Sequence, residues 1–131
     1  MKKNNKGFTL MEMLIVVAII GVLVAIAIPT VTANLQKSKQ AADEANVRSA
    51  YAEASAGYLM GDGGTTTTAP MQANCAENVN IGGYTFKSNP STATGSKEAQ
   101  AWTAGQVVKV TVDAGGATFK CEAAGSSSTT K

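Results

Sequence analysis

The feature that most constrains this chain is an apolar run of 21 residues, positions 8–28, in which Glu12 is the one charged residue. A helix of that length spans ~30 Å, which matches the hydrocarbon thickness of a bilayer. Three lysines lie within residues 2–6, and a long polar segment follows the run. The positive-inside rule then places the N-terminus in the cytoplasm and residues 29 onward outside. We predict a single membrane-spanning helix followed by an exported part.

The same start also fits two more general kinds of segment. A basic stretch, an apolar stretch and small-residue sites at Ala25-Ile26-Ala27 or Val31-Thr32-Ala33 describe an ordinary secretory signal peptide, and a plain single-pass anchor is the other alternative. Glu12 argues against both, because a carboxylate in the apolar run costs up to ~3 kcal/mol for insertion and contributes nothing to a discarded signal. Only a segment that stays in the mature protein could use the Glu12 carboxylate.

Residues 6–12 read K-G-F-T-L-M-E and lead directly into the apolar run. This string resembles the N-terminal signature of type IV prepilins and of the related pseudopilins of type II secretion and competence systems. The resemblance covers about residues 2–35. It implies that a prepilin peptidase cuts between Gly7 and Phe8 and that the same membrane enzyme N-methylates Phe8.

Cleavage would leave a positive amine on Phe8, one helical turn from Glu12, with both charges in apolar surroundings. If subunits stack with a stagger, the amine of one copy can pair with Glu12 of its neighbour, so that the charges are compensated only in the correct register. Breaking a buried pair costs ~3–5 kcal/mol, which would favour addition of the next subunit. The alternative is that Phe8 and Glu12 pair within one chain at i and i+4.

Gly21 and Pro29 bracket a weaker part of the predicted helix. Glycine has a low helix propensity, and proline lacks an amide hydrogen while its ring crowds the carbonyl of Ala25. The resemblance implies that this stretch unwinds in filaments, which would make them extensible. The alternative is that Gly21 allows close helix packing and that Pro29 produces a mild kink.

Residues 29–60 are rich in helix formers and are predicted to continue the helix to about Met60. We predict one mildly apolar stripe on this part, formed by Val31, Leu35, Ala42, Ala45, Ala52 and Leu59. The opposite face would be solvated and would carry two i, i+4 pairs, namely Lys39 with Asp43 and Glu44 with Arg48. A helix from Phe8 to Met60 would be ~80 Å long, so its first half must find lipid or other copies of itself.

The exported part changes character at residues 61–70, GDGGTTTTAP, which read as a loop. Strands are predicted at 84–88, 106–113 and 117–123, the last two joined by a turn at 114–116. The fold class is therefore α+β: a long N-terminal helix whose hydrophobic half protrudes and whose amphipathic half packs on a small antiparallel sheet of three to four strands. Six aromatic residues are expected to supply bulk to this core: Tyr51, Tyr58, Tyr84, Phe86, Trp102 and Phe119.

Cys75 and Cys121 are the two cysteines of the sequence, and both lie in the exported part. An even count in an oxidising compartment favours a disulfide, worth ~4 kcal/mol for a loop of this length. Many pilins that this chain resembles close a C-terminal loop in the same way. The alternative is a pair of reduced, buried thiols.

Composition argues against several other functions. The sequence has no histidine and two cysteines, which leaves no imidazole or thiolate metal site and no Ser-His or Cys-His pair, and we expect no enzyme, no metal site and no cofactor. Without the three N-terminal lysines, 8 basic groups face 9 acidic ones. That balance gives no basic surface for direct nucleic-acid binding.

These inferences divide the chain into a basic leader (1–7), a transmembrane and assembly helix (8–28), an amphipathic helix (29–60) and an exported loop and sheet (61–131). The predicted function is that of a pilin-like structural subunit, held in the membrane as a precursor and assembled with copies of itself into a cell-surface type IV pilus-like filament. Its other partners would be the prepilin peptidase/methyltransferase and the pilus or secretion assembly machinery. A pseudopilin of a secretion or DNA-uptake piston, and a monomeric secreted or anchored domain, are the alternatives.

Overall fold

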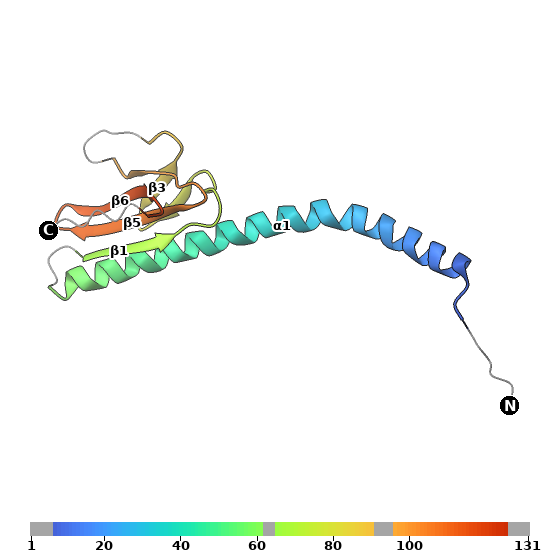
Figure 1. Ribbon diagram of the computed structural model, residues 1–131. Helices are drawn as coiled ribbons and strands as arrows, with labels where there is room; N and C mark the ends of the chain where they lie inside the picture. The colour runs from blue at the N-terminus through green and yellow to red at the C-terminus, as the bar shows by residue number, and fades with distance from the viewer. Residues whose placement is uncertain (1–6, 62–64, 91–95, 126–131) are drawn as a thin grey trace, which may run out of the picture. The chain divides into compact units, whose positions relative to one another are not determined.

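The computed structural model describes residues 7–61, 65–90 and 96–125 (Figure 1). Residues 1–6 of the predicted leader and the C-terminal segment 126–131 lie outside the described residues. The chain divides into two compact units, residues 1–35 and residues 36–131. Each unit is described by itself below.

One helix, α1 (Leu10–Leu59), accounts for 50 residues and runs through the boundary between the two units. Its bounds agree within two residues with the helix predicted from Phe8 to Met60. The residues of α1 that belong to the first unit are exposed throughout. They bury nothing within the described part of that unit, so the apolar surface remains for lipid or another protein.

The second unit contains two small sheets. Sheet A has the order β1-β5-β6 and is antiparallel throughout, and its strands are β1 (Thr65–Pro70), β5 (Gln106–Asp113) and β6 (Gly116–Ala123). Sheet B has the order β2-β3-β4, and its strands are β2 (Val79–Ile81), β3 (Tyr84–Lys87) and β4 (Glu98–Gln100). Strands β2 and β3 are antiparallel, whereas β3 and β4 are parallel. With α1 these sheets make an α+β fold, which confirms the predicted class.

The three predicted strands are present as β3, β5 and β6. The prediction of a loop over 61–70 is wrong for its second half, because Thr65–Pro70 forms β1 and pairs with β5. A run of β-branched threonines suits an edge strand, and the proline stands at the end of β1, where a missing amide costs least. The expectation of one antiparallel sheet also differs from the structure, which has two sheets and one parallel pair.

The core of the second unit lies between α1 and the sheets. Val108 and Val110 of β5 are fully buried, as the alternating pattern of that strand predicts. Phe86 contacts both Trp102 and Phe119 edge to face, with ring centroids 5.1 and 5.0 Å away. Offset and edge-to-face aromatic pairs of this kind add stability beyond the area they bury. Of the six predicted aromatic residues, these three are buried, and Tyr51 and Tyr84 pack against them.

The predicted apolar stripe of α1 is wrong. All six of its residues are exposed, and the buried face is instead formed by Asp43, Val47, Ala50 and Ala54. Their spacing of four, three and four is regular for a helix, but the stripe contains a carboxylate and two alanines. In an alanine-rich segment the apolar contrast between faces is weak, so the pattern did not indicate which face is buried.

Asp43 is the buried polar residue of this core, with no exposed surface. Its Oδ2 accepts hydrogen bonds from the backbone amides of Gln72, at 2.9 Å, and Ala73, at 2.7 Å, and its Oδ1 lies 3.0 Å from the Gln72 amide. The predicted solvated pair of Asp43 with Lys39 is therefore wrong. The other predicted pair, Glu44 with Arg48, is present.

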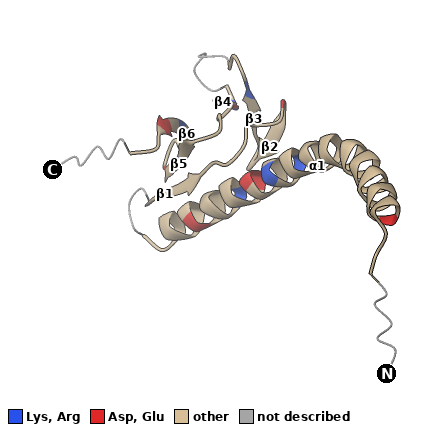
Figure 2. Ribbon diagram, turned by 45° about the vertical axis from the view of Figure 1, so that its right-hand side comes forward, with Lys and Arg blue, Asp and Glu red and all other residues tan. Residues whose placement is uncertain are grey.

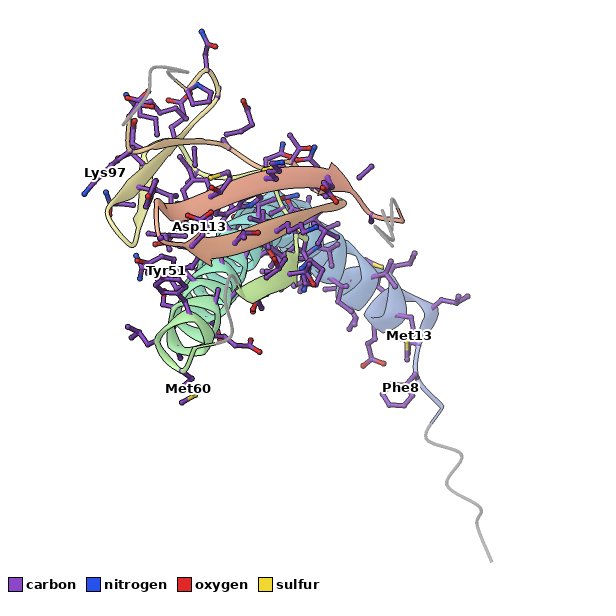
Figure 3. All side chains as sticks on the ribbon, turned by 90° about the vertical axis from the view of Figure 1, so that its left-hand side faces the viewer. Phe8, Met13, Tyr51, Met60, Lys97 and Asp113 are labelled. Atoms are coloured by element: carbon purple, nitrogen blue, oxygen red, sulfur yellow. The ribbon has the colours of Figure 1, made fainter. Side chains whose placement is uncertain are left out.

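Two glycines allow close approaches, one between sheet B and the helix and one between the two sheets. Gly82, with φ +60°, lies in the β2–β3 turn, and a Cβ there would come within 2.5 Å of the Tyr51 ring. Gly116 begins β6 with φ +121°, next to the hydroxyl of Tyr84, which accepts a hydrogen bond from the Ala117 amide at 3.1 Å. Tyr51 lies on the side of α1 that faces the strands (Figure 3).

Candidate functional site

The first candidate site is the peptide between Gly7 and Phe8. Gly7, Phe8 and Thr9 are outside the helix, and all three are exposed. The Phe8 side chain is 81% exposed and stands clear of α1 in Figure 3. An exposed peptide outside regular secondary structure is one that a peptidase can reach, and the predicted cleavage bond is such a peptide.

Glu12 lies in the first turn of α1 and forms a reciprocal capping box with Thr9. The Thr9 amide donates to Glu12 Oε2 at 3.0 Å, and the Glu12 amide donates to Thr9 Oγ1 at 3.3 Å. Thr9 is thus the N-cap residue and Glu12 is the third residue of the helix, which is the arrangement that satisfies two otherwise unpaired amides. The negative charge also lies at the positive end of the helix dipole.

In the uncut chain Phe8 carries a peptide nitrogen and no free amine, so the pairing of Phe8 with Glu12, within one chain or between chains, stays a prediction. The hydrogen bonds of the Glu12 side chain go to Thr9 through Oε2 and, within the described residues, Oε1 has no partner. One carboxylate oxygen therefore caps its own helix, and the other is exposed. The capping role was missed by the sequence analysis, although the T-x-x-E spacing before an apolar run is its known signal.

The apolar surface that follows Glu12 is continuous. Large aliphatic side chains between Leu10 and Ile28 are between 46 and 85% exposed. Figure 2 shows this half of α1 without basic or acidic residues beyond the acidic residue in its first turn. By length and composition α1 qualifies as a membrane-spanning helix, and the qualifying window has no buried surface.

Gly21 and Pro29 both lie within α1, which is helical over the whole stretch between them. A Cβ at Gly21 would meet nothing within 4 Å. Beyond Pro29, the hydroxyls of Thr30 and Thr32 donate back to the carbonyls of Ile26 and Ile28, at 3.3 and 2.9 Å. Such bonds compete with the helical ladder and often accompany bending. Local weakening of this segment stays a prediction.

Cys75 and Cys121 are both half-buried and are free thiols in the structure. Both contact residues 100–102: the Cys75 amide donates to the Trp102 carbonyl at 2.9 Å, and Cys121 Sγ is 3.4 Å from the Gln100 carbonyl. Burial raises the pKa of the Cys75 thiol to about 11, with smaller contributions in the same direction from Cys121 and Glu44. Burial also raises the pKa of Cys121. The predicted disulfide is not formed here and stays a prediction.

Among the described residues, no group of three or more cysteine or acidic side chains is placed to hold a metal ion. Asp113 is the last residue of β5, and its carboxylate accepts a hydrogen bond from the Gly115 amide at 2.8 Å. Its carboxylate stabilises the hairpin turn, as aspartate commonly does there.

Comparison with known proteins matches these features. Residues 2–28 match the family model described as a prokaryotic N-terminal methylation motif. Fimbrial protein Q of Moraxella bovis is 36% identical over 129 positions, which cover 86% of this chain and 82% of the relative. Competence protein ComGC of Bacillus subtilis is 40% identical over 70 residues, covering 53% of this chain and 71% of the relative. Type IV major pilin protein PilA of Myxococcus xanthus is 51% identical over 48 residues, which span 37% of this chain and 22% of that protein.

An N-terminal methylation motif, an exposed apolar helix and a small α+β unit define a pilin-like structural subunit. The chain belongs to the family of type IV pilins and competence pseudopilins that share this motif, since the match to fimbrial protein Q extends over most of both chains. No solved structure matches the chain.

Proposed function

We propose that the chain is made as a single-pass membrane precursor and polymerises, after cleavage between Gly7 and Phe8 and N-methylation of Phe8, into a type IV pilus-like filament on the cell surface. The leader would be residues 1–7, the assembly helix 8–28, its amphipathic continuation 29–60 and the exported surface 61–131. The prepilin peptidase and the pilus assembly machinery would be its processing partners. The subunit is structural, and we assign it no catalytic role.

The observation that carries this proposal is the exposed apolar stretch of α1 with one carboxylate at its start. An apolar surface of this length is stable in lipid or against identical helices, and transfer between the two keeps it out of water. The accessible Gly7–Phe8 peptide lies at the end of this stretch, where cleavage leaves an amine beside the apolar surface.

The capping box refines how Glu12 contributes to assembly. Because Oε2 accepts from the Thr9 amide while Oε1 is exposed, Glu12 can cap its own helix and still accept the amine of Phe8 from a neighbouring copy. In an apolar bundle the uncompensated carboxylate and amine would each be costly, so pairing rewards the correct stagger. Capping and pairing thus use different oxygens of one side chain.

We also propose a Cys75–Cys121 disulfide in the exported protein. The Cys75 amide and the Cys121 thiol both contact the Gln100–Trp102 segment, and closing the bond would tie the loop before β2 to β6. Non-reducing mass spectrometry of protein from the cell surface should show a loss of about 2 Da relative to the reduced chain. A chain with two alkylatable cysteines would contradict this proposal.

The processing step is tested by mass spectrometry of the mature protein. We expect an N-terminus at N-methylated Phe8. An N-terminus at Ile28 or Asn34 would mean removal of an ordinary signal peptide, and an uncut chain would mean a plain anchor.

The charge-pairing step is tested with Glu12→Gln and Thr9→Val as matched variants. Glutamine keeps the capping geometry but removes the charge, whereas Thr9→Val removes the side-chain cap and keeps the charge. We expect Glu12→Gln to be processed normally but to form few filaments, and Thr9→Val to form filaments with a smaller loss. Normal filaments from Glu12→Gln would remove the charge pair from the mechanism.

A competence or secretion pseudopilin is the second candidate, favoured by the 40% identity with ComGC. The two functions differ in the length of the assembly. Long filaments of this subunit in sheared surface fractions would support the pilus, and short or absent filaments together with loss of secretion or DNA uptake on deletion would support the piston.

A further inference from the structure

Residues 72–74 bond to one turn of α1, and we call this set of hydrogen bonds the clasp. The Asp43 carboxylate accepts from two consecutive backbone amides of the loop, at 2.9 and 2.7 Å, and Gln40 Nε2 donates to the Asn74 carbonyl at 3.2 Å. In Figure 1 the loop that follows β1 lies beside α1. The clasp therefore joins this loop to the helix at positions 40 and 43.

The clasp is itself held to the core of the second unit. Asn74 Oδ1 accepts from the Ala104 amide at 2.9 Å, and the Cys75 amide donates to the Trp102 carbonyl at 2.9 Å. Trp102 is a buried member of the core. Displacing the clasp from the second unit would therefore disturb buried apolar packing, which is costly because it exposes apolar surface to water.

The part of α1 before the clasp has no such support. Every residue from Leu10 to Ser38 is exposed, and Lys39 is the first half-buried residue of the helix. Residues 29–38 lie beyond the apolar run, and among the described residues no side chain or backbone group from outside α1 bonds to them. The boundary between the two compact units, after Leu35, falls within this segment.

The sequence of this segment also disfavours a helix. Pro29 has no amide to donate to the helical ladder. Thr30, Val31 and Thr32 are β-branched and have low helix propensity, and the hydroxyls of both threonines donate to carbonyls of the ladder. Short helical segments are marginal in water without tertiary contacts. The helical form of residues 29–38 thus depends on the helix at either side of them.

We propose that the clasp is a stop for unwinding of α1. Residues 29–39 can unwind while the second unit stays folded, and the unwinding ends at Gln40. Unwinding a further turn would break the hydrogen bonds of the clasp and leave buried groups of Asp43 and of the loop unpaired, which is the expensive step. This segment is separate from the predicted weak stretch between Gly21 and Pro29, which lies inside the apolar run.

The stop has a consequence for a filament under tension. Each residue that passes from helical to extended form gains ~2 Å of length, so the segment could lengthen while the exported surface keeps its fold. That consequence rests on the proposed function, whereas the stop itself does not.

Hydrogen exchange of the full-length chain in a mild non-ionic detergent tests the stop. No filament is needed, so a failure here is separate from a failure of the proposed function. In the wild type we expect the amides of residues 33–42 to exchange at least about tenfold faster than those of residues 44–50. The amides of residues 44–50 donate to the carbonyls of residues 40–46, so they stay protected as long as the helix is intact from Gln40 onward.

Asp43→Ala removes the carboxylate of the clasp, and the next buried residue of α1 is then Val47. Unwinding should reach Val47, so the exchange of residues 44–50 should become about tenfold faster relative to that of β5. The β5 amides serve as the reference because general destabilisation accelerates both sets. Lys39→Ala is the matched control: Lys39 lies in the same turn but has no hydrogen bond or ion pair among the described residues, so the ratio should not change.

Each other outcome overturns the proposal. Equal exchange of residues 33–42 and 44–50 in the wild type would mean that α1 does not unwind before the clasp, and fast exchange that continues through residue 50 would mean that the clasp does not stop it. An unchanged ratio in Asp43→Ala, or the same change in Lys39→Ala, would mean that the carboxylate is not the stop. If Asp43→Ala does not fold, Asp43→Asn takes its place, with a smaller change of the ratio in the same direction, and the wild-type profile still decides.

Discussion

Asp43 should be the polar residue on which the stability of the second unit most depends. Its carboxylate has no exposed surface and accepts from two backbone amides, those of Gln72 and Ala73. Each hydrogen bond to a charged group contributes about 1.5–3 kcal/mol, and the donors that remain after truncation lose their partner in a buried place. We therefore expect Asp43→Ala to lower the free energy of unfolding by about 3–5 kcal/mol, a large share of the ~5–15 kcal/mol of a typical domain.

Two variants make the measurement specific. Asp43→Asn keeps one carbonyl acceptor and nearly the same volume, so it should lose about 1–3 kcal/mol. Lys39→Ala removes the side chain that the sequence pairs with Asp43, and it should change the free energy of unfolding by less than about 0.5 kcal/mol, because the structure shows no hydrogen bond or ion pair between the two.

Urea unfolding of the full chain in a mild non-ionic detergent measures these changes, with fluorescence of the single tryptophan as the signal. Trp102 is 2% exposed in the fold, so its emission reports loss of the core. A loss below about 1 kcal/mol for Asp43→Ala, or equal losses for Asp43→Ala and Lys39→Ala, would refute the conclusion that the buried carboxylate holds the loop to the helix.

Three further predictions concern local contacts. Gly82→Ala should lower the free energy of unfolding by about 2 kcal/mol more than Gly83→Ala, because both glycines have positive φ but only Gly82 lies against the Tyr51 ring. Equal effects of the two substitutions in urea unfolding would mean that the ring moves aside without cost. In the reduced protein, Cys75 should react with iodoacetamide at pH 8 about a hundredfold more slowly than a free thiol, since a pKa of about 11 leaves about one thiolate per thousand thiols. The alkylation rate should keep rising with pH up to about pH 11. A plateau of the rate near pH 9 would contradict the burial of the thiol. Arg48→Ala should change unfolding by less than about 0.5 kcal/mol, because its bond to Glu44 is solvent-exposed, and a larger loss would indicate an additional role for the arginine.

Much of the candidate assembly site could be read from the sequence because its determinants are close together in the chain. The apolar run, the Gly7–Phe8 bond and Glu12 all lie within a few helical turns, and length and hydropathy alone predict the helix. The reciprocal bonds between Thr9 and Glu12 also follow from a local spacing, T-x-x-E before an apolar run. The alternation along β5 predicted its buried valines for the same reason.

The tertiary structure decided which face of α1 is buried, and no local pattern contained that information. Asp43 is 29 residues from Gln72 in sequence, so local spacing suggested its i, i+4 neighbour Lys39 as the charged partner and could not indicate the Gln72 amide. Likewise, β1 became a strand through its pairing with β5, some 40 residues later, where threonines gain hydrogen bonds that an isolated segment could not hold. Short-range propensity fixes where elements can form, whereas the burial of polar groups depends on donors that only the folded chain brings together.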